Sequence, residues 1–184
     1  MRPRKVAIVG ATGAVGQEFV AVLEQRGFPF DALVLLASER SAGKVVKVRG
    51  CEHVVQELRP GCFAGVDLAL FSAGAAVSRE WAPRAVEAGA VVVDNSSTFR
   101  MHNGVPLVVP EVNPQALAGH RGIIANPNCS TILLVVVLAP LHRAAGLAGV
   151  VVSTYQAASG AGQRAVEELR SHTRARLDGQ ALTP

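Results

Sequence analysis

The residue in this sequence best suited to covalent chemistry is Cys129. It follows a turn-forming segment, Asn126-Pro127-Asn128, and precedes an apolar run over residues 132–138 that predicts a helix. The first turn of a helix carries unpaired N–H groups and a partial positive charge, which favour a thiolate over a thiol. A thiolate is the nucleophile that acyl-transfer and aldehyde chemistry need. The alternative is a buried structural cysteine beside a helix cap.

A glycine-rich turn near the beginning of the chain is the second candidate. Its spacing is G-x-x-G-x-x-G, and it lies between an apolar strand at residues 6–9 and a helix at residues 14–25. Glycines at such a turn let the backbone approach a dinucleotide pyrophosphate, which lies on the helix N-terminus. The strand–turn–helix context strengthens the prediction. We expect this turn to contact a cofactor through Gly10, Thr12, Gly13, Ala14, Val15 and Gly16.

The tip of the second predicted strand indicates which nicotinamide cofactor would bind. An NAD site usually has an acidic residue there, which binds the ribose 2′-hydroxyl. In this chain the strand at residues 32–37 is followed by hydroxyls and cations, namely Ser38, Arg40, Ser41 and Lys44. These groups suit a 2′-phosphate, so the sequence favours NADP over NAD. Glu39 favours NAD unless its side chain points to solvent, and the two cations could equally belong to a solvated loop.

Other polar clusters fall at predicted strand ends, where open α/β sheets bind ligands. They are residues 94–100, the cysteine loop and residues 155–162. Small residues at 72–74 end another strand, and they allow either a close cofactor or close helix packing. A nucleophilic thiolate, an arginine for an anion and a nicotinamide cofactor imply one reaction class. That class is the interconversion of an aldehyde and an acyl phosphate through a thioester.

Strands and helices alternate along the chain, which predicts a mostly parallel, doubly wound α/β sheet. Further strands are expected at residues 66–71, 90–93 and 149–156. Residues 44–49 and 52–58 should form a hairpin or edge strands, with a turn at Gly50. Further helices are expected at residues 78–87, with Pro83 near the first turn, at 129–145 and at 160–177. Residues 107–109 should be extended, and residues 113–117 should form a short helical turn.

The composition is that of about one domain. The chain has 184 residues, of which 49% are hydrophobic, and a formal net charge of +4. No apolar run is long enough to cross a membrane, and the basic start leads into a strand rather than a signal peptide. Arginines at residues 164–176 alternate with glutamates, which is typical of a solvated helix face and not of a nucleic-acid site. Three cysteines at irregular spacing show no metal-ligand pattern and favour a reduced, cytoplasmic location.

The chain closely resembles the aspartate-β-semialdehyde dehydrogenases. The matching stretches follow the order of the family along nearly the whole chain, at residues 9–16, 37–44, 70–74, 92–100, 108–113, 123–131 and 153–162. Glyceraldehyde-3-phosphate dehydrogenases differ in the glycine turn and carry a Ser-Cys-Thr-Thr loop. N-acetyl-glutamyl-phosphate reductases differ in the neighbourhood of the cysteine.

The resemblance implies a Rossmann-like fold and a reaction in lysine, methionine and threonine biosynthesis. Cys129 would attack the acyl phosphate of 4-phospho-L-aspartate, and NADPH would reduce the thioester to L-aspartate 4-semialdehyde. Arg100 would hold the phosphate with Asn128 beside it, and Gln156 would orient the substrate. The remaining cofactor contacts would come from Ser72, Ala73, Gly74, Ser159, Gly160 and Gly162.

Members of this family are roughly twice this long, and their second domain supplies a catalytic histidine, a carboxylate-binding arginine and most of a homodimer interface. None of the five histidines of this chain lies in the corresponding motif. We therefore expect an NADP-binding domain at residues 1–128 and the truncated beginning of an incomplete second α/β domain, for catalysis and dimerisation, at 129–184. Three interpretations follow: a fragment that is inactive alone, a half-enzyme completed by another chain, or a non-catalytic NADP-binding module.

Overall fold

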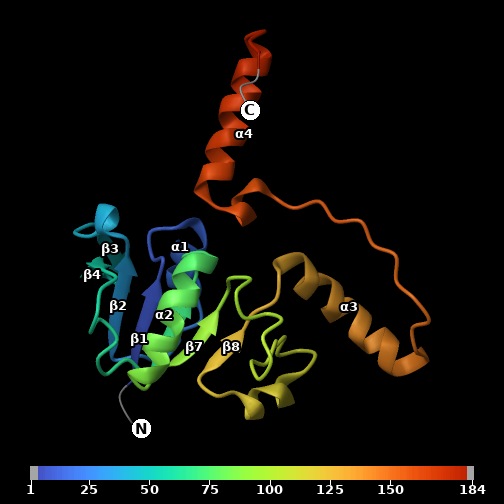
Figure 1. The fold of residues 1–184 in the computed structure, drawn as a ribbon, viewed down its shortest axis with the longest axis horizontal. Helices are drawn as coiled ribbons and strands as arrows, with labels where there is room; N and C mark the ends of the chain where they lie inside the picture. Colours follow the sequence, from blue (N-terminus) through green and yellow to red (C-terminus); the bar gives the residue numbers. More distant parts are fainter. Residues whose placement is uncertain (1–3, 182–184) are drawn as a thin grey trace. The chain divides into compact units, whose positions relative to one another are not determined.

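A six-stranded parallel sheet forms the centre of the first part of the chain (Figure 1). The computed structural model describes residues 4–181, and its contacts divide the chain into two units, Met1–Gly149 and Val150–Pro184. The strand order is β5-β2-β1-β6-β7-β8, and all neighbours are parallel. The strands are β1 Lys5–Val9, β2 Ala32–Ala37, β5 Gln56–Glu57, β6 Leu68–Phe71, β7 Val91–Asp94 and β8 Ile123–Ala125. This is the order of a Rossmann sheet, so the predicted fold class is confirmed.

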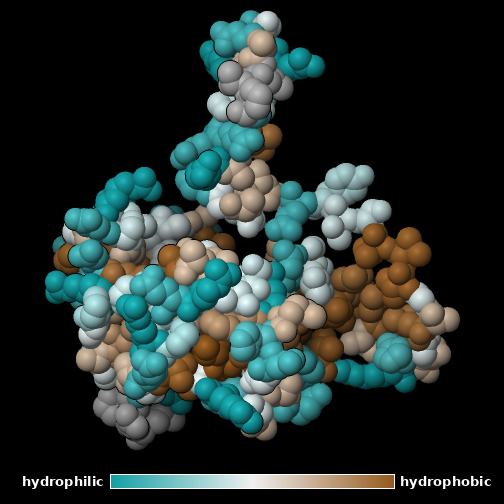
Figure 2. Space-filling model, in the orientation of Figure 1, coloured by the Kyte–Doolittle hydropathy of each residue, from teal (hydrophilic) through white to brown (hydrophobic). Residues whose placement is uncertain are grey.

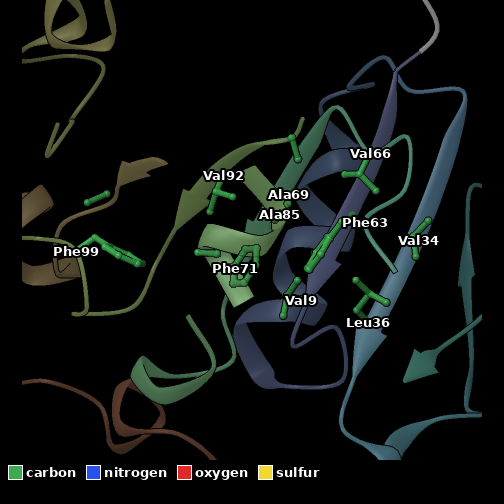
Figure 3. Close-up of a cluster of buried hydrophobic side chains, with 14 residues drawn as sticks. Val9, Val34, Leu36, Phe63, Val66, Ala69, Phe71, Ala85, Val92 and Phe99 are labelled. Carbon is green, nitrogen blue, oxygen red and sulfur yellow. The ribbon is translucent and has the colours of Figure 1, made fainter. Parts of the chain in front are cut away.

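Helices cover both faces of this sheet because alternate strand residues point to opposite sides. Val6 and Ile8 pack in a cluster with residues of α1, Ala14–Gln25. Ala7 and Val9 pack in the other cluster, with residues of α2, Ala75–Glu87 (Figure 3). The continuous apolar sequence of β1 is therefore explained by burial on both faces.

A separate two-stranded hairpin follows β2. Its strands are β3, Val45–Val48, and β4, Cys51–Val54. The turn was correctly predicted at Gly50, but the single strand expected over residues 52–58 is wrong. The strand is interrupted at the buried Val55, and the residues that follow it form β5, which pairs with β2. Residues 51–57 therefore contribute strands to two sheets, β4 to the hairpin and β5 to the parallel sheet.

The hairpin turn holds the end of α1 through Arg49. This residue adopts a left-handed backbone conformation with φ of 50°, which is uncommon for a residue with a side chain. Its guanidinium donates hydrogen bonds to the carbonyl oxygens of Leu23 (3.3 Å) and Phe28 (2.6 Å). It also lies 4.2 Å from the ring centroid of Phe30. A cation at a helix C-terminus interacts favourably with the helix dipole.

Helix α2 begins earlier than the sequence predicted, at Ala75 and not at residue 78. Gly74 precedes it with φ of 90°, a conformation that glycine adopts readily. Pro83 consequently lies inside the helix and not in its first turn. Because proline has no N–H, the helix lacks the hydrogen bond to the carbonyl of Arg79 at this point.

The remaining elements differ in how well the sequence predicted them. The helix α3, Cys129–Ala145, has the predicted bounds and belongs to the first unit. The predicted strand at 149–156 is wrong, because this extended segment pairs with no other strand in the described chain. A short 3₁₀ helix, Ala158–Ala161, separates it from α4, Gln163–Leu177. Two further 3₁₀ turns are Glu39–Ser41 and Pro114–Gly119. Leu107 forms an isolated bridge with Ala125 at the edge of the sheet.

Candidate active site

The glycine turn brings the carboxyl end of β1 against that of β2. The N–H groups of Gly10 and Ala11 both donate to the carbonyl oxygen of Leu36, at 2.8 and 3.1 Å. Gly13 then donates to the carbonyl oxygen of Gly10 (2.9 Å) and forms the N-cap of α1 without a side-chain hydrogen bond. The first turn of α1 contains no acidic residue. Its N–H groups and the positive end of the helix dipole therefore suit an anion such as a pyrophosphate.

The three glycines of this turn differ in how strictly the fold requires them. A Cβ at Gly10 would overlap the carbonyl oxygen of Ser72, and a Cβ at Gly16 would overlap that of Gly10. These two glycines are needed by the fold itself. Gly13 is exposed and has φ of −76°, and its Cβ would lie 3.3 Å from the oxygen of Gly10. Of the three, Gly13 is the glycine that the fold requires least. Close approach of a ligand to the backbone would explain why a glycine nevertheless occupies this position.

The end of β6 meets the same turn. Ser72 donates its N–H to the carbonyl oxygen of Val9 (2.9 Å), and its own carbonyl contacts Gly10. In the sheet, β2 lies on one side of β1 and β6 lies on the other. The order in which the chain adds strands therefore reverses at β1, which makes this the topological switch point of the sheet. In open α/β sheets ligands bind at that crevice. The small residues at 72–74 therefore allow close approach of the two loops, and they line the place where a dinucleotide would lie.

The tip of β2 presents a mixed set of side chains. Ser38 is the exposed N-cap residue of the 3₁₀ turn Glu39–Ser41, and Arg40 and Lys44 are exposed. Ser41, in contrast, is buried with 8% of its surface exposed. Ser41 donates its N–H to the carbonyl oxygen of Ser38 (2.8 Å). Contact of Ser38, Arg40 and Ser41 with a cofactor stays a prediction.

Cys129 is the first residue of α3, as predicted, and its side chain is exposed. Asn128 caps the helix, because its side-chain oxygen accepts a hydrogen bond from the N–H of Ser130 (3.0 Å). The sulfur of Cys129 lies 4.0 Å from the same oxygen. With its oxygen used as the cap, Asn128 would have to contact an anion through its amide nitrogen. The structural alternative of a buried cysteine is excluded by the exposure of Cys129.

Arg100 joins the loops that follow β7 and β8. Its Nε donates to the carbonyl oxygen of Asn126 (2.9 Å), and its Nη2 donates to that of Asn95 (3.1 Å). The side chains of these two asparagines also bond to each other, from Nδ2 of Asn126 to Oδ1 of Asn95 (2.8 Å). Arg100 is thus bonded to Asn126, which lies three residues before Cys129 in the cysteine loop. A guanidinium has five N–H groups, so others remain for an anion.

A buried polar network below Arg100 was not predicted. The carboxylate of Asp94 has no exposed surface and accepts hydrogen bonds from the hydroxyls of Ser78 (2.6 Å) and Ser96 (2.7 Å), and from the Ser96 N–H (3.1 Å). Ser96 Oγ in turn accepts a bond from the N–H of Thr98 (3.1 Å). The polar residues 94–100 indicated a possible ligand site at this strand end. No pattern in the sequence indicated that Ser78 in α2 would contact them.

The other predicted site residues lie in the second unit. Gln156 is exposed, and its side-chain amide lies against Gly160, where a Cβ would overlap it. Ser159 and Gly160 belong to the 3₁₀ helix, and Gly162, with φ of 94°, is the N-cap of α4. These four residues are close together in the chain. Contact of Gln156 with the substrate, and of the other three residues with the cofactor, stays a prediction.

The three cysteines are free thiols with different environments. Cys51 and Cys129 are exposed, whereas Cys62 is partly buried. Burial raises the pKa of the Cys62 thiol. Within residues 4–181, no group of three or more His, Cys, Asp or Glu side chains could hold a metal ion. In the same range no helix is both long and apolar enough to cross a membrane.

Two regions of this chain match domains of known proteins. Residues 5–120 match the NAD-binding domain of semialdehyde dehydrogenases, and residues 138–184 match the dimerisation domain of the same enzymes. The chain belongs to the aspartate-semialdehyde dehydrogenase family. The predicted boundary between residues 128 and 129 falls between the two matched regions, while α3 has its contacts in the first unit. That boundary stays a prediction.

Individual members of the family are very similar to this chain. The aspartate-semialdehyde dehydrogenases of Bacillus subtilis and Aquifex aeolicus are 57% and 56% identical to it over 179 and 181 residues. Each alignment covers 97% of this chain but only 52% and 53% of the relative, so the chain spans about half the length of these relatives.

Solved structures of the family extend the comparison. The crystal structure of aspartate semialdehyde dehydrogenase II of Vibrio cholerae, complexed with ASA, matches with a TM-score of 0.93 and 48% identity. It covers all of this chain, and the chain covers 55% of it. The Candida albicans enzyme with NADP matches with a TM-score of 0.67 and 34% identity, covering 79% of this chain and 48% of its own.

Proposed function

We propose that this chain carries the cofactor site and the nucleophile for NADP-dependent reductive dephosphorylation of 4-phospho-L-aspartate to L-aspartate 4-semialdehyde. The observation that carries the proposal is the pair of hydrogen bonds from Arg100 to Asn95 and Asn126. They fix an anion-binding group to the loop that ends in the exposed Cys129. Membership of the aspartate-semialdehyde dehydrogenase family supports the proposed substrate class.

The proposed reaction begins with attack by the Cys129 sulfur on the acyl carbon. A C–S bond forms, the bond from carbon to the phosphate oxygen breaks, and phosphate leaves with the electron pair. Arg100 binds the phosphate before and after this step, because a guanidinium matches the geometry of phosphate oxygens. Asn128 would contribute a donor from its amide nitrogen. Gln156 would orient the acyl group if the second unit comes to Cys129.

The cofactor would lie across the carboxyl ends of β2, β1 and β6. Gly13 and the first turn of α1 would hold the pyrophosphate, and Ser38 and Arg40 would hold the 2′-phosphate. When bound, NADPH supplies the hydride that reduces the thioester to the aldehyde. Breaking of the C–S bond then returns Cys129 to its thiolate form. Free cysteines and this metabolic role are consistent with the cytoplasmic location that we propose.

Trapping of the covalent intermediate tests this function directly. The whole chain is incubated with 4-phospho-L-aspartate, and the adduct is located by peptide mass spectrometry. We expect an aspartyl adduct on Cys129 that hydroxylamine releases, as it does for thioesters. Cys51→Ser should leave the adduct unchanged, because Cys51 is exposed but lies in the β3–β4 hairpin, which is not part of the parallel sheet. Labelling of Cys51 and Cys129 to the same extent would refute the assignment.

A second possibility is that another polypeptide completes the enzyme. Figure 2 shows a hydrophobic surface over α3, where Leu133 and Val137 expose 74% and 61% of their surface. No residue of α3 or α4 is buried. Apolar patches of this kind mark interaction surfaces. If the half-enzyme interpretation is correct, phosphate-dependent reduction of NADP⁺ by aspartate semialdehyde appears only after addition of a chain with the acid–base histidine. Full activity of this chain alone would exclude it.

A further inference from the structure

We propose that Asp94 is a positioning residue that sets the orientation of the Arg100 guanidinium. The inference deepens the proposed function and rests on it, because it assigns the device that aligns the phosphate-binding group. Asp94 is the last residue of β7 and has no exposed surface. A buried carboxylate is costly unless it is fully hydrogen-bonded. Here it accepts three hydrogen bonds, so it organises the donors around it.

The two acceptors of Arg100 are both fixed by Asp94. Asn95, whose carbonyl oxygen accepts the hydrogen bond from Nη2 of Arg100, lies between Asp94 and Ser96 in the chain. Ser96 is bonded to the Asp94 carboxylate through both its N–H and its hydroxyl. The carbonyl oxygen of Asn126 accepts the hydrogen bond from Nε of Arg100. The N–H of Asn126 donates to the main-chain oxygen of Asp94 (2.8 Å). A shift of Asp94 would therefore move both supports of the guanidinium together.

Helix α2 supplies the reference point for this network. The hydroxyl of Ser78 donates to Asp94, and the hydroxyl of Thr98 donates to the carbonyl oxygen of Ala75 in the first turn of the helix (2.8 Å). Ser78 has no exposed surface. The loop that carries Arg100 is thus tied at two points to an element that packs on the sheet. This explains why a serine, rather than an apolar residue, occupies a fully buried position of α2.

Asp94→Asn tests the proposal with little change in shape. Three donors meet the carboxylate, but an amide offers only one oxygen, and its NH₂ group cannot accept. We expect the Nε–H of Arg100 and the amide of Asn126 to exchange about tenfold faster in NMR, while the amides of β1 keep their rates. Ser78→Ala should act in the same direction and more weakly, and it serves if Asp94→Asn does not fold.

Phosphate binding gives the functional measurement. Inorganic phosphate should slow alkylation of Cys129 in the wild-type chain, and the phosphate concentration for half protection should rise about fivefold in Asp94→Asn, the effect of one lost hydrogen bond. Val20→Ala is the control for general destabilisation, because Val20 is buried in α1 on the other face of the sheet. It should lower stability without changing phosphate protection.

The possible results separate the inference from the proposed function. If phosphate does not protect the wild type, the proposed phosphate site is wrong, and the Arg100 exchange rates still decide the positioning role. If phosphate protects the wild type and Asp94→Asn equally, with unchanged Nε–H exchange, the proposed function stands and the inference is overturned. An equal loss of protection in Val20→Ala would also overturn it, because the effect would then reflect stability alone.

Discussion

Replacement of Gly13 by alanine should separate cofactor binding from folding. The residue has φ of −76° and ψ of 163°, a conformation that alanine adopts without strain. Its new Cβ would lie 3.3 Å from the Gly10 oxygen, which requires only a small adjustment. A strain-free Gly→Ala change also restricts the unfolded chain and stabilises by about 0.4–1 kcal/mol. We therefore expect the free energy of unfolding to change by less than about 1 kcal/mol.

The same methyl group should weaken the cofactor site strongly. It would project from the exposed N-cap of α1, where a pyrophosphate must approach the backbone. Loss of one hydrogen bond between a backbone N–H and a charged oxygen costs about 1.5–3 kcal/mol. The dissociation constant of NADP should rise roughly tenfold to a hundredfold. Isothermal titration calorimetry measures this value, and urea unfolding measures the stability of the same samples.

Two further glycines provide the controls. In Gly16→Ala, the Cβ would overlap the backbone of Gly10, so stability itself should fall by about 1–3 kcal/mol. Gly119 has nothing within 4 Å of its Cβ position, so Gly119→Ala should change neither quantity. NADP binding within about twofold of wild type in Gly13→Ala would refute our placement of the pyrophosphate on α1. A wild-type chain that binds no NADP would refute the cofactor proposal altogether.

Three other predictions concern reactivity, cofactor choice and stability. Iodoacetamide should alkylate the exposed Cys129 at least about tenfold faster than Cys62 at neutral pH, because burial raises the Cys62 pKa and lowers its thiolate fraction. The alkylation rate of Cys62 should rise only at more alkaline pH. Equal rates for the two cysteines would argue against a reactive Cys129. Arg40→Glu should weaken NADP binding by about tenfold and leave NAD binding unchanged, and a parallel loss of both would show that Arg40 does not contact the 2′-phosphate. Arg49→Ala should lower the free energy of unfolding by about 2 kcal/mol, because the side-chain hydrogen bonds are lost. Arg49→Gly should recover about half of that loss, because glycine adopts the left-handed backbone conformation of this residue more easily. Equal losses for the two variants in urea unfolding would show that this backbone conformation costs no stability.

The sequence predicted the parts of this protein that depend on local patterns. The apolar run of β1, the glycine turn and the start of α3 at Cys129 are each specified by neighbouring residues, and each was found where it was expected. The parallel, doubly wound sheet followed from the alternation of strands and helices. Most of the proposed site belongs to the same class, since its residues lie at strand ends.

The features that the sequence did not predict depend on distant partners. Residues 149–156 are rich in β-branched side chains, but composition does not supply a neighbouring strand, and none pairs with them in the described chain. Ser78 meets Asp94 across 16 positions, which no local pattern encodes. The position of Pro83 inside α2 is a similar case, because packing of the helix on the sheet outweighs the local cost of proline.

The Arg49 contacts also have a consequence for the order in which the protein loses structure. The main-chain N–H of Arg49 donates to the carboxylate of Glu24 (2.6 Å), so the end of α1 is held by residues that follow it by 25 positions. Helix ends fray in the absence of such caps. We therefore expect the last turn of α1 and the β3–β4 hairpin to open as one cooperative unit, with amide exchange rates that change together when Arg49 is replaced. This unit includes the strand that follows residues 38–44, so partial unfolding there would remove the 2′-phosphate contacts that we propose while the rest of the sheet stays intact.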